Sequence, residues 1–176
     1  MGRSQRGNNN GYCQDGPLTW HHWKLEPEQQ EFLEFARRVV TLRRNHPNFR
    51  RHSYREQDPQ VAPMAQGLDW FRPDGERMEE DDWQQFWVKS LGVYLRGDAD
   101  EIRDENGHPV PDDDFLIFFN AHHEGVSFEL SPELERGWTV VFDTEAGDLP
   151  EDGSEPEAIF PFILGGRSLV LLRHVR

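Results

Sequence analysis

Short runs of β-prone residues, separated by turn-forming clusters, are the feature of this sequence that most restricts its fold. From Gly67 onward, β-branched and aromatic residues gather in runs of five to seven residues, at 68–72, 90–96, 114–120, 126–130, 138–143 and 169–173. The clusters between them are rich in Asp, Asn, Gly and Pro, which favour tight turns. Strands this short and closely spaced pair with their neighbours, so the sequence predicts a mainly β fold, with an antiparallel β-sandwich over residues 66–176. Residues 79–87 interrupt the pattern and are expected to form a short helical or irregular insertion.

A single amphipathic helix is predicted ahead of the strands, from Pro27 to about Asn45. Pro27 suits the first turn of a helix, and the sequence Asn45-His46-Pro47 is expected to end it. The apolar residues of the helix recur at spacings of three and four, and therefore share one broad face: Phe32, Phe35, Ala36, Val39, Val40 and Leu42. The sequence offers no second helix of this kind to cover that face. We therefore expect the segment, together with the loop at residues 1–19, to lie against a neighbour outside this chain.

The net charge of −14 is unevenly distributed and excludes some classes of partner. Residues 1–60 hold 10 basic and 7 acidic side chains, whereas residues 61–176 hold 9 and 26. The acidic part would repel a phosphate backbone or an anionic membrane surface, so we expect neither nucleic acid nor membrane as a partner. A lone cysteine, Cys13, cannot form an internal disulfide, and no secretory signal is visible. These features predict a cytoplasmic location.

Several ordered motifs, spread over nearly the whole chain, resemble those of one enzyme family. The first are Gly2-Arg3-Ser4-Gln5-Arg6-Gly7-Asn8-Asn9-Asn10-Gly11-Tyr12-Cys13-Gln14-Asp15 and Leu18-Thr19-Trp20-His21-His22-Trp23. Later ones are Leu68-Asp69-Trp70-Phe71-Arg72-Pro73-Asp74-Gly75, Ser90-Leu91-Gly92-Val93, Phe118-Phe119-Asn120-Ala121-His122-His123-Glu124 and Gly166-Arg167-Ser168-Leu169-Val170. Together they resemble bacterial glycogen-debranching enzymes of the isoamylase branch of the α-amylase superfamily.

The resemblance implies a division of the chain and a function. Residues 1–55 would be a loop and the last helix of a catalytic (β/α)₈ barrel, and residues 66–176 a C-terminal β-sandwich. The parent enzyme would hydrolyse α-1,6-glucosidic branch linkages in glycogen or limit dextrin. Its catalytic carboxylates lie upstream of the matching part, so no catalytic residue is assigned here. We expect this chain alone to be inactive, to need no cofactor and to have a structural or accessory role beside the missing barrel.

The N-terminal loop carries the candidate substrate contacts in the intact parent. Amide and carboxylate side chains can bind sugar hydroxyls and a tyrosine ring can stack on a pyranose, which suggests these residues: Asn8, Asn9, Asn10, Tyr12, Gln14 and Asp15. In the alternative interpretation these side chains satisfy only the backbone of their own loop. The function also has an alternative, a stand-alone α-glucan-binding or self-associating β-sandwich module. Homo-oligomerisation would then use the exposed helix.

Other reactive side chains are interpreted as structural. The pair His21-His22 has no third ligand at a fixed spacing, which makes it weak evidence for zinc. His122, His123 and Glu124 are expected on a strand, where neighbouring side chains point to opposite faces and cannot easily converge on one ion. The acidic turns at 98–105 and 112–114 lack the spacing of a calcium loop. We therefore predict no metal site.

Overall fold

The computed structural model describes residues 7, 11, 15–17, 19–20, 22–51, 67–86, 88–98, 102–104, 106–145 and 154–176. The chain divides into two compact units, Met1–Asn45 and His46–Arg176. Residues 46–51 therefore belong to the same unit as the strands. The division into 1–55 and 66–176, which rests on the resemblance, stays a prediction. No helix in the described part of the chain is both long enough and apolar enough to cross a bilayer.

The predicted amphipathic helix is confirmed as α1 (Pro27–Asn45). Glu28 lies in its first turn and Arg43 and Arg44 in its last, where each charge opposes the nearer end of the helix dipole. None of its residues is buried, and two of its large apolar side chains are about half exposed, Phe32 at 51% and Val40 at 58%. The first unit thus has a well-formed helix whose apolar face is partly exposed to solvent.

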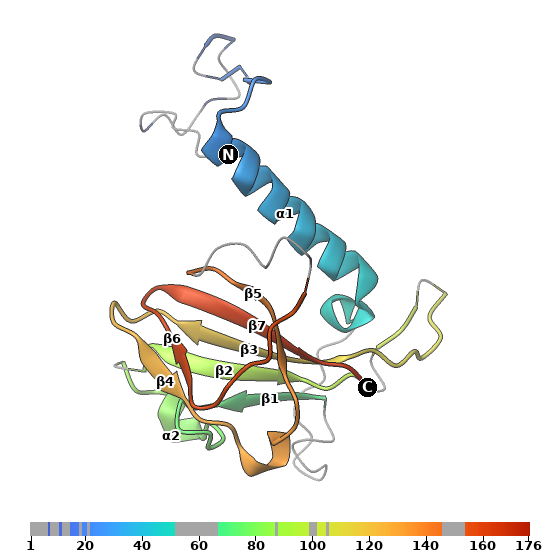
Figure 1. Cartoon of the computed structure of the whole chain (residues 1–176), viewed down its shortest axis with the longest axis vertical. Coiled ribbons are helices and arrows are strands. Elements are labelled where there is room, and N and C mark those ends of the chain that lie inside the picture. Colours follow the sequence, from blue (N-terminus) through green and yellow to red (C-terminus); the bar gives the residue numbers. More distant parts are fainter. Residues whose placement is uncertain are drawn as a thin grey trace. The chain divides into compact units, whose positions relative to one another are not determined.

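The second unit is built mainly of short strands, shown in Figure 1. In chain order they are β1 (Leu68–Phe71), β2 (Ser90–Leu95), β3 (Asp114–Asn120), β4 (Val126–Phe128), β5 (Thr139–Asp143), β6 (Phe162–Leu164) and β7 (Ser168–His174). In the described part of this unit three short helices accompany them: the 3₁₀-helix η2 (Pro47–Arg50), α2 (Glu80–Trp83) and the 3₁₀-helix η4 (Pro132–Leu134). The six predicted strands are all present and α2 lies within the predicted insertion, whereas β6 was missed.

The strands form two antiparallel sheets, which confirms the predicted sandwich. The larger sheet has the order β1-β2-β3-β7-β5, and the smaller pairs β4 with β6. The central strand β3 pairs along its whole length with β7, from Asp114 opposite His174 to Asn120 opposite Ser168. Because β3 and β7 run antiparallel in full register, the C-terminal end of β3 lies beside the N-terminal end of β7. This end of the sheet carries the candidate site described below.

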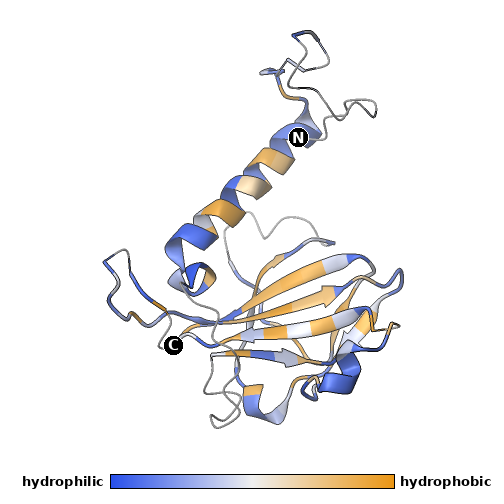
Figure 2. Ribbon diagram, turned by 180° about the vertical axis from the view of Figure 1, so that it is seen from behind, coloured by the Kyte–Doolittle hydropathy of each residue, from blue (hydrophilic) through white to orange (hydrophobic). Residues whose placement is uncertain are grey.

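The core fills the space between the two sheets. One face of the larger sheet contributes Tyr94, Leu116, Phe118, Val170 and Leu172, and the smaller sheet contributes Phe128 and Leu164. The rings of Phe118 and Phe128 stack across the layers with centroids 4.4 Å apart. Figure 2 shows the corresponding strands as mostly hydrophobic, with the hydrophilic colours concentrated in α2 and the loops. Burial of these side chains is the main term that stabilises the unit.

Candidate functional site

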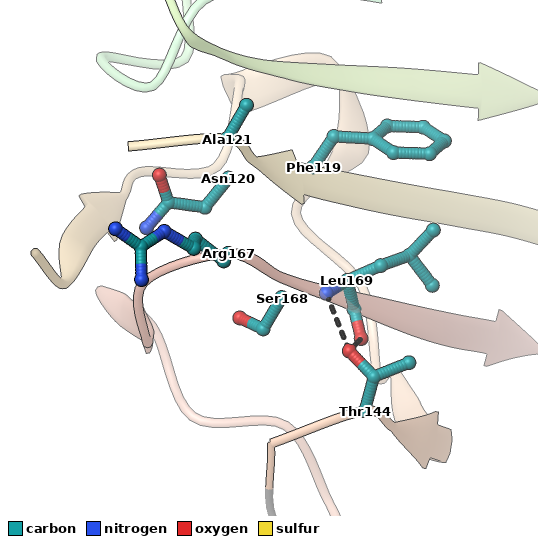
Figure 3. A pocket seen from close by; sticks show the side chains of 7 residues that line it. All are labelled: Phe119, Asn120, Ala121, Thr144, Arg167, Ser168 and Leu169. Carbon is teal, nitrogen blue, oxygen red and sulfur yellow. Dashed lines mark hydrogen bonds between the residues drawn. The ribbon is translucent and has the colours of Figure 1, made fainter. Parts of the chain in front are cut away.

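A hollow of about 430 Å³ opens at the end of the large sheet where β3 stops and β7 starts. Figure 3 shows the residues that line it: Phe119, Asn120, Ala121, Thr144, Arg167, Ser168 and Leu169. Phe119 and Leu169 are cross-strand partners and form an apolar wall, of which Phe119 keeps 37% of its surface exposed. A hollow with an exposed aromatic wall can hold an apolar group of a partner molecule.

Arg167 brings a positive charge to this hollow from a strained backbone position. Its φ of 56° is in the left-handed region, which is unfavourable for a residue with a Cβ atom. The conformation is held in part because the Arg167 backbone N–H donates to the carbonyl of His122 at 2.8 Å. In the view of Figure 3 the guanidinium extends to the side of the hollow opposite Phe119.

The hydroxyl groups of the hollow are already used by the fold. Thr144 Oγ1 accepts from the Leu169 backbone N–H at 2.8 Å and donates to its carbonyl at 3.2 Å. Ser168 Oγ donates to the Gly165 carbonyl at 2.6 Å. Among the described residues that line the hollow there is no carboxylate. These groups can contact a ligand or a partner surface, but they cannot supply the acid and base that cleavage of a glycosidic bond requires.

Asn120 fixes the backbone around the hollow. Its side chain is 2% exposed, and its Oδ1 accepts from Ser90 Oγ and from the His122 backbone N–H, both at 2.9 Å. Its Nδ2 donates to the carbonyls of Glu124 at 2.9 Å, Leu164 at 3.2 Å and Gly165 at 2.8 Å. One buried amide therefore ties together β2, the turn between β3 and β4, and the turn between β6 and β7.

The residues His122, His123 and Glu124, which we call the His-His-Glu turn, do not lie on a strand as expected. β3 ends at Asn120, and the three residues form a bend before β4. The predicted alternation of side chains therefore fails, because the bend has no pleat to send neighbours to opposite faces. The two imidazole rings have centroids 4.2 Å apart, and His123 Nε2 lies 3.8 Å from Glu124 Oε1. One donor atom from each of the three residues lies within 4.8 Å of the other two.

A second group of metal-ligating residues, His46, Asp112 and Asp113, is explained by hydrogen bonds alone. His46 Nδ1 lies 2.7 Å from Asp112 Oδ1, and the other Asp112 oxygen accepts from the Asn48 backbone N–H at 2.9 Å. Burial alone would raise the pKa of Asp112, but these bonds and the Asp113 N–H together hold its pKa below the ordinary value. The cluster fastens residues 46–48 to Asp112, just before the start of β3, a contact that sequence reasoning missed.

The buried carboxylates of the described residues are bound to arginines. Asp114 is fully buried and binds Arg136 Nη1 at 2.8 Å, Arg176 Nε at 2.7 Å and the Gly97 backbone N–H at 2.6 Å. Asp69 is 5% exposed and pairs with Arg77 at 3.0 Å. Burial raises the pKa of Asp69, and the Arg77 charge offsets that effect only in part. Such arrangements are typical of structural ion pairs rather than of a catalytic acid and base.

Most of the predicted sugar contacts lie outside the described residues: Asn8, Asn9, Asn10, Tyr12 and Gln14. Asp15 is described and exposed, and its carboxylate accepts a hydrogen bond from the Trp20 indole N–H. This contact joins two side chains rather than a side chain and the loop backbone, so it decides between neither interpretation. The role of all six residues in substrate binding stays a prediction.

Comparison with known proteins confirms the resemblance on which the sequence analysis drew. Residues 67–173 match the family model for the C-terminal domain of isoamylase. A glycogen operon protein GlgX homolog of Mycobacterium tuberculosis is 36% identical over 98% of this chain, and a glycogen debranching enzyme of Pectobacterium carotovorum is 35% identical over 87%. The chain spans only 24% and 19% of these two relatives.

A solved structure supports the same fold. The pullulanase from Bacillus acidopullulyticus covers 98% of this chain with a TM-score of 0.58 and 14% sequence identity, and the chain spans 17% of that protein. The likeness at this identity concerns the fold alone. Since the family match covers more than half of the residues, and a relative is 36% identical over nearly all of them, the chain belongs to the isoamylase C-terminal family.

Proposed function

We propose that this chain forms the C-terminal part of a glycogen-debranching enzyme, a glycoside hydrolase that cleaves α-1,6-glucosidic branch linkages in glycogen or limit dextrin. The observation that carries the proposal is the similarity over 98% of the chain to a relative of which the chain spans only 24%. Relatives from Pectobacterium and Dickeya are named as glycogen debranching enzymes. A cytoplasmic location fits this role and the lone Cys13.

The chain itself would have a structural and accessory role, with the catalytic carboxylates in another part of the longer protein. A retaining glycosidase needs two carboxyl groups about 5–5.5 Å apart on either side of the scissile bond. In the described part of the chain, Asp69 and Asp114, the two buried carboxylates, are paired with arginines. The open hollow has no carboxylate among its described lining residues. Both observations support an inactive fragment.

We further propose that the catalytic barrel of the longer protein is the direct partner of this chain and that α-glucan is reached through that enzyme. The support is the apolar face of α1, where Phe32 and Val40 are 51% and 58% exposed. A helix with one apolar face is stable mainly through packing of that face against a neighbour. A barrel that ends in this helix would supply such a neighbour.

The test is a reducing-end assay of the purified chain on a glycogen limit dextrin, with the full-length Pectobacterium relative as the positive control. We expect no release of reducing ends above the background without enzyme. Turnover by the chain at a rate comparable to that of the control, retained through a second purification step, would refute the proposal that this chain lacks a catalytic centre.

The alternative function is a stand-alone α-glucan-binding or self-associating module. The observation that favours it is the exposure of large aromatic side chains, with Trp23 at 86%, Phe86 at 89% and Trp83 at 47%. Aromatic faces of this kind bind sugar rings in many proteins, and they also drive self-association. Titration calorimetry with maltooligosaccharides and size-exclusion chromatography of the chain distinguish the two versions. Absence of a heat of binding would exclude the glucan-binding version, and elution as a monomer would exclude the self-associating version.

A further inference from the structure

We propose that the His-His-Glu turn is a binding site for a divalent transition metal ion of the zinc class. The turn supplies two imidazoles and one carboxylate from three consecutive residues, and their donor atoms already lie within 4.8 Å of one another. This site is independent of the proposed glucan chemistry, since it needs no part of the catalytic barrel.

The distances lie close to those of a coordinated ion. Zinc binds imidazole nitrogens and carboxylate oxygens at about 2.0–2.2 Å, so donors around a tetrahedral ion lie about 3.4 Å apart. His123 Nε2 and Glu124 Oε1, at 3.8 Å, need to approach by a few tenths of an ångström. Both side chains are well exposed, 62% and 73%, so rotation about their own bonds can close the gap without repacking the core. Imidazole ligands favour zinc, copper or nickel over magnesium and calcium.

The backbone of the turn is held rigidly, which reduces the entropy that an ion must overcome on binding. Asn120 binds the turn at both ends, through the His122 N–H and the Glu124 carbonyl. The Arg167 N–H holds the His122 carbonyl. On the other side Gly166 packs so closely that a Cβ atom there would overlap the His123 carbonyl. Ion binding therefore has to order only three side chains.

One existing contact competes with an ion that binds His122 through Nδ1. The Glu124 backbone N–H donates to His122 Nδ1 at 3.2 Å, so this nitrogen carries a lone pair that already has a partner. The bond is at the long end of the hydrogen-bond range, and its loss costs little because Glu124 is at the surface, where water can replace it. With three protein ligands the fourth position of a tetrahedral ion stays open to water or to an external ligand.

The test is a Zn²⁺ titration of the full chain by calorimetry, combined with NMR of the ¹⁵N-labelled imidazoles. Other histidines and Cys13 contribute a background, so the comparison is between variants. We expect His123→Gln and Glu124→Gln each to weaken the tightest Zn²⁺ event roughly tenfold or more, because loss of a ligand costs at least as much as loss of its supporting contacts. Zn²⁺ should shift the ring signals of His122 and His123 first.

The matched control is His108→Gln. His108 is also an exposed histidine beside a carboxylate, 3.4 Å from Asp104, but it has no third ligand in the described metal-ligating clusters. This variant should leave the affinity within twofold of the parent. All three substitutions are at exposed positions, and an unchanged urea midpoint confirms that each variant is folded. The proposal is overturned if Glu124→Gln binds Zn²⁺ as the parent does, or if the first ring signals to shift belong to other histidines.

Discussion

Replacing Asp114 by Asn tests whether the second unit depends on a buried charge. The carboxylate has no exposed surface and accepts bonds from Arg136, Arg176 and the Gly97 N–H. An amide of the same shape removes the charge and turns one acceptor into a donor that faces another donor. Loss of one partner from a buried ion pair costs about 3–5 kcal/mol. The two guanidiniums are 25% and 32% exposed and can be partly resolvated, so we expect a value near the lower end, about 3 kcal/mol.

Urea unfolding followed by tryptophan fluorescence measures this loss, because Trp138 is buried in the core of the same unit. With a urea slope of about 1–3 kcal/mol/M, the midpoint should fall by about 1–3 M. Glu133→Gln is the matched control, since Glu133 also binds an arginine, Arg77 at 2.7 Å, but is 54% exposed. An exposed pair contributes about 0–1 kcal/mol. A midpoint for Asp114→Asn no lower than that of Glu133→Gln would refute the reasoning.

Three further substitutions probe the polar contacts of the same unit. Asn120→Ala leaves three buried or half-buried carbonyls without the Nδ2 donor and should cost about 3 kcal/mol in the same urea assay. A loss below about 1 kcal/mol would contradict the role of Asn120 in tying β2 to the two turns. The pKa of Asp112 is lowered in the folded state, so its stabilising effect is present above the ordinary value of 3.8 and is lost as the pH falls through the folded pKa. The free energy of unfolding of the parent should therefore exceed that of Asp112→Asn by less and less as the pH falls from about 5 to below 3.8. A difference that does not depend on pH would contradict the lowered pKa of Asp112. The pKa of Asp69 is raised, so its contribution is present below 3.8 and is lost as the pH rises through the folded pKa. Between acidic and neutral pH, the free energy of unfolding of Asp69→Asn should therefore rise relative to that of the parent. A relative fall would mean that the Arg77 charge outweighs burial in setting the pKa of Asp69.

Sequence patterns predicted the elements whose residue periodicity is a local property of the chain. The three- and four-residue spacing in α1 is a local property of the chain, and the helix has its predicted bounds, Pro27–Asn45. The β-rich runs likewise became strands. β6 was missed because it is only three residues, Phe162–Leu164, between Pro161 and two glycines, too short for any alternation to appear.

The candidate site could not be predicted in the same way, because it is assembled by pairing rather than by local pattern. The hollow brings residues near 120, 144 and 168 together, and the pairing of β7 with both β3 and β5 places them side by side. The His-His-Glu turn was visible as a motif, but its geometry depends on where β3 ends. That end is set by the buried Asn120 side chain, three of whose five hydrogen bonds reach residues far along the sequence, Ser90, Leu164 and Gly165.

The strand order has a consequence for how the chain emerges from the ribosome. β5 has a single neighbour in its sheet, β7, which follows the other described strands in chain order and also pairs with β3. A nascent chain that stops before residue 168 therefore leaves one edge of β3 unpaired, and leaves β5 with only its backbone contacts to residues 156–158. Both strands then invite pairing with other chains. Protection of this domain during translation must last until β7 has left the exit tunnel.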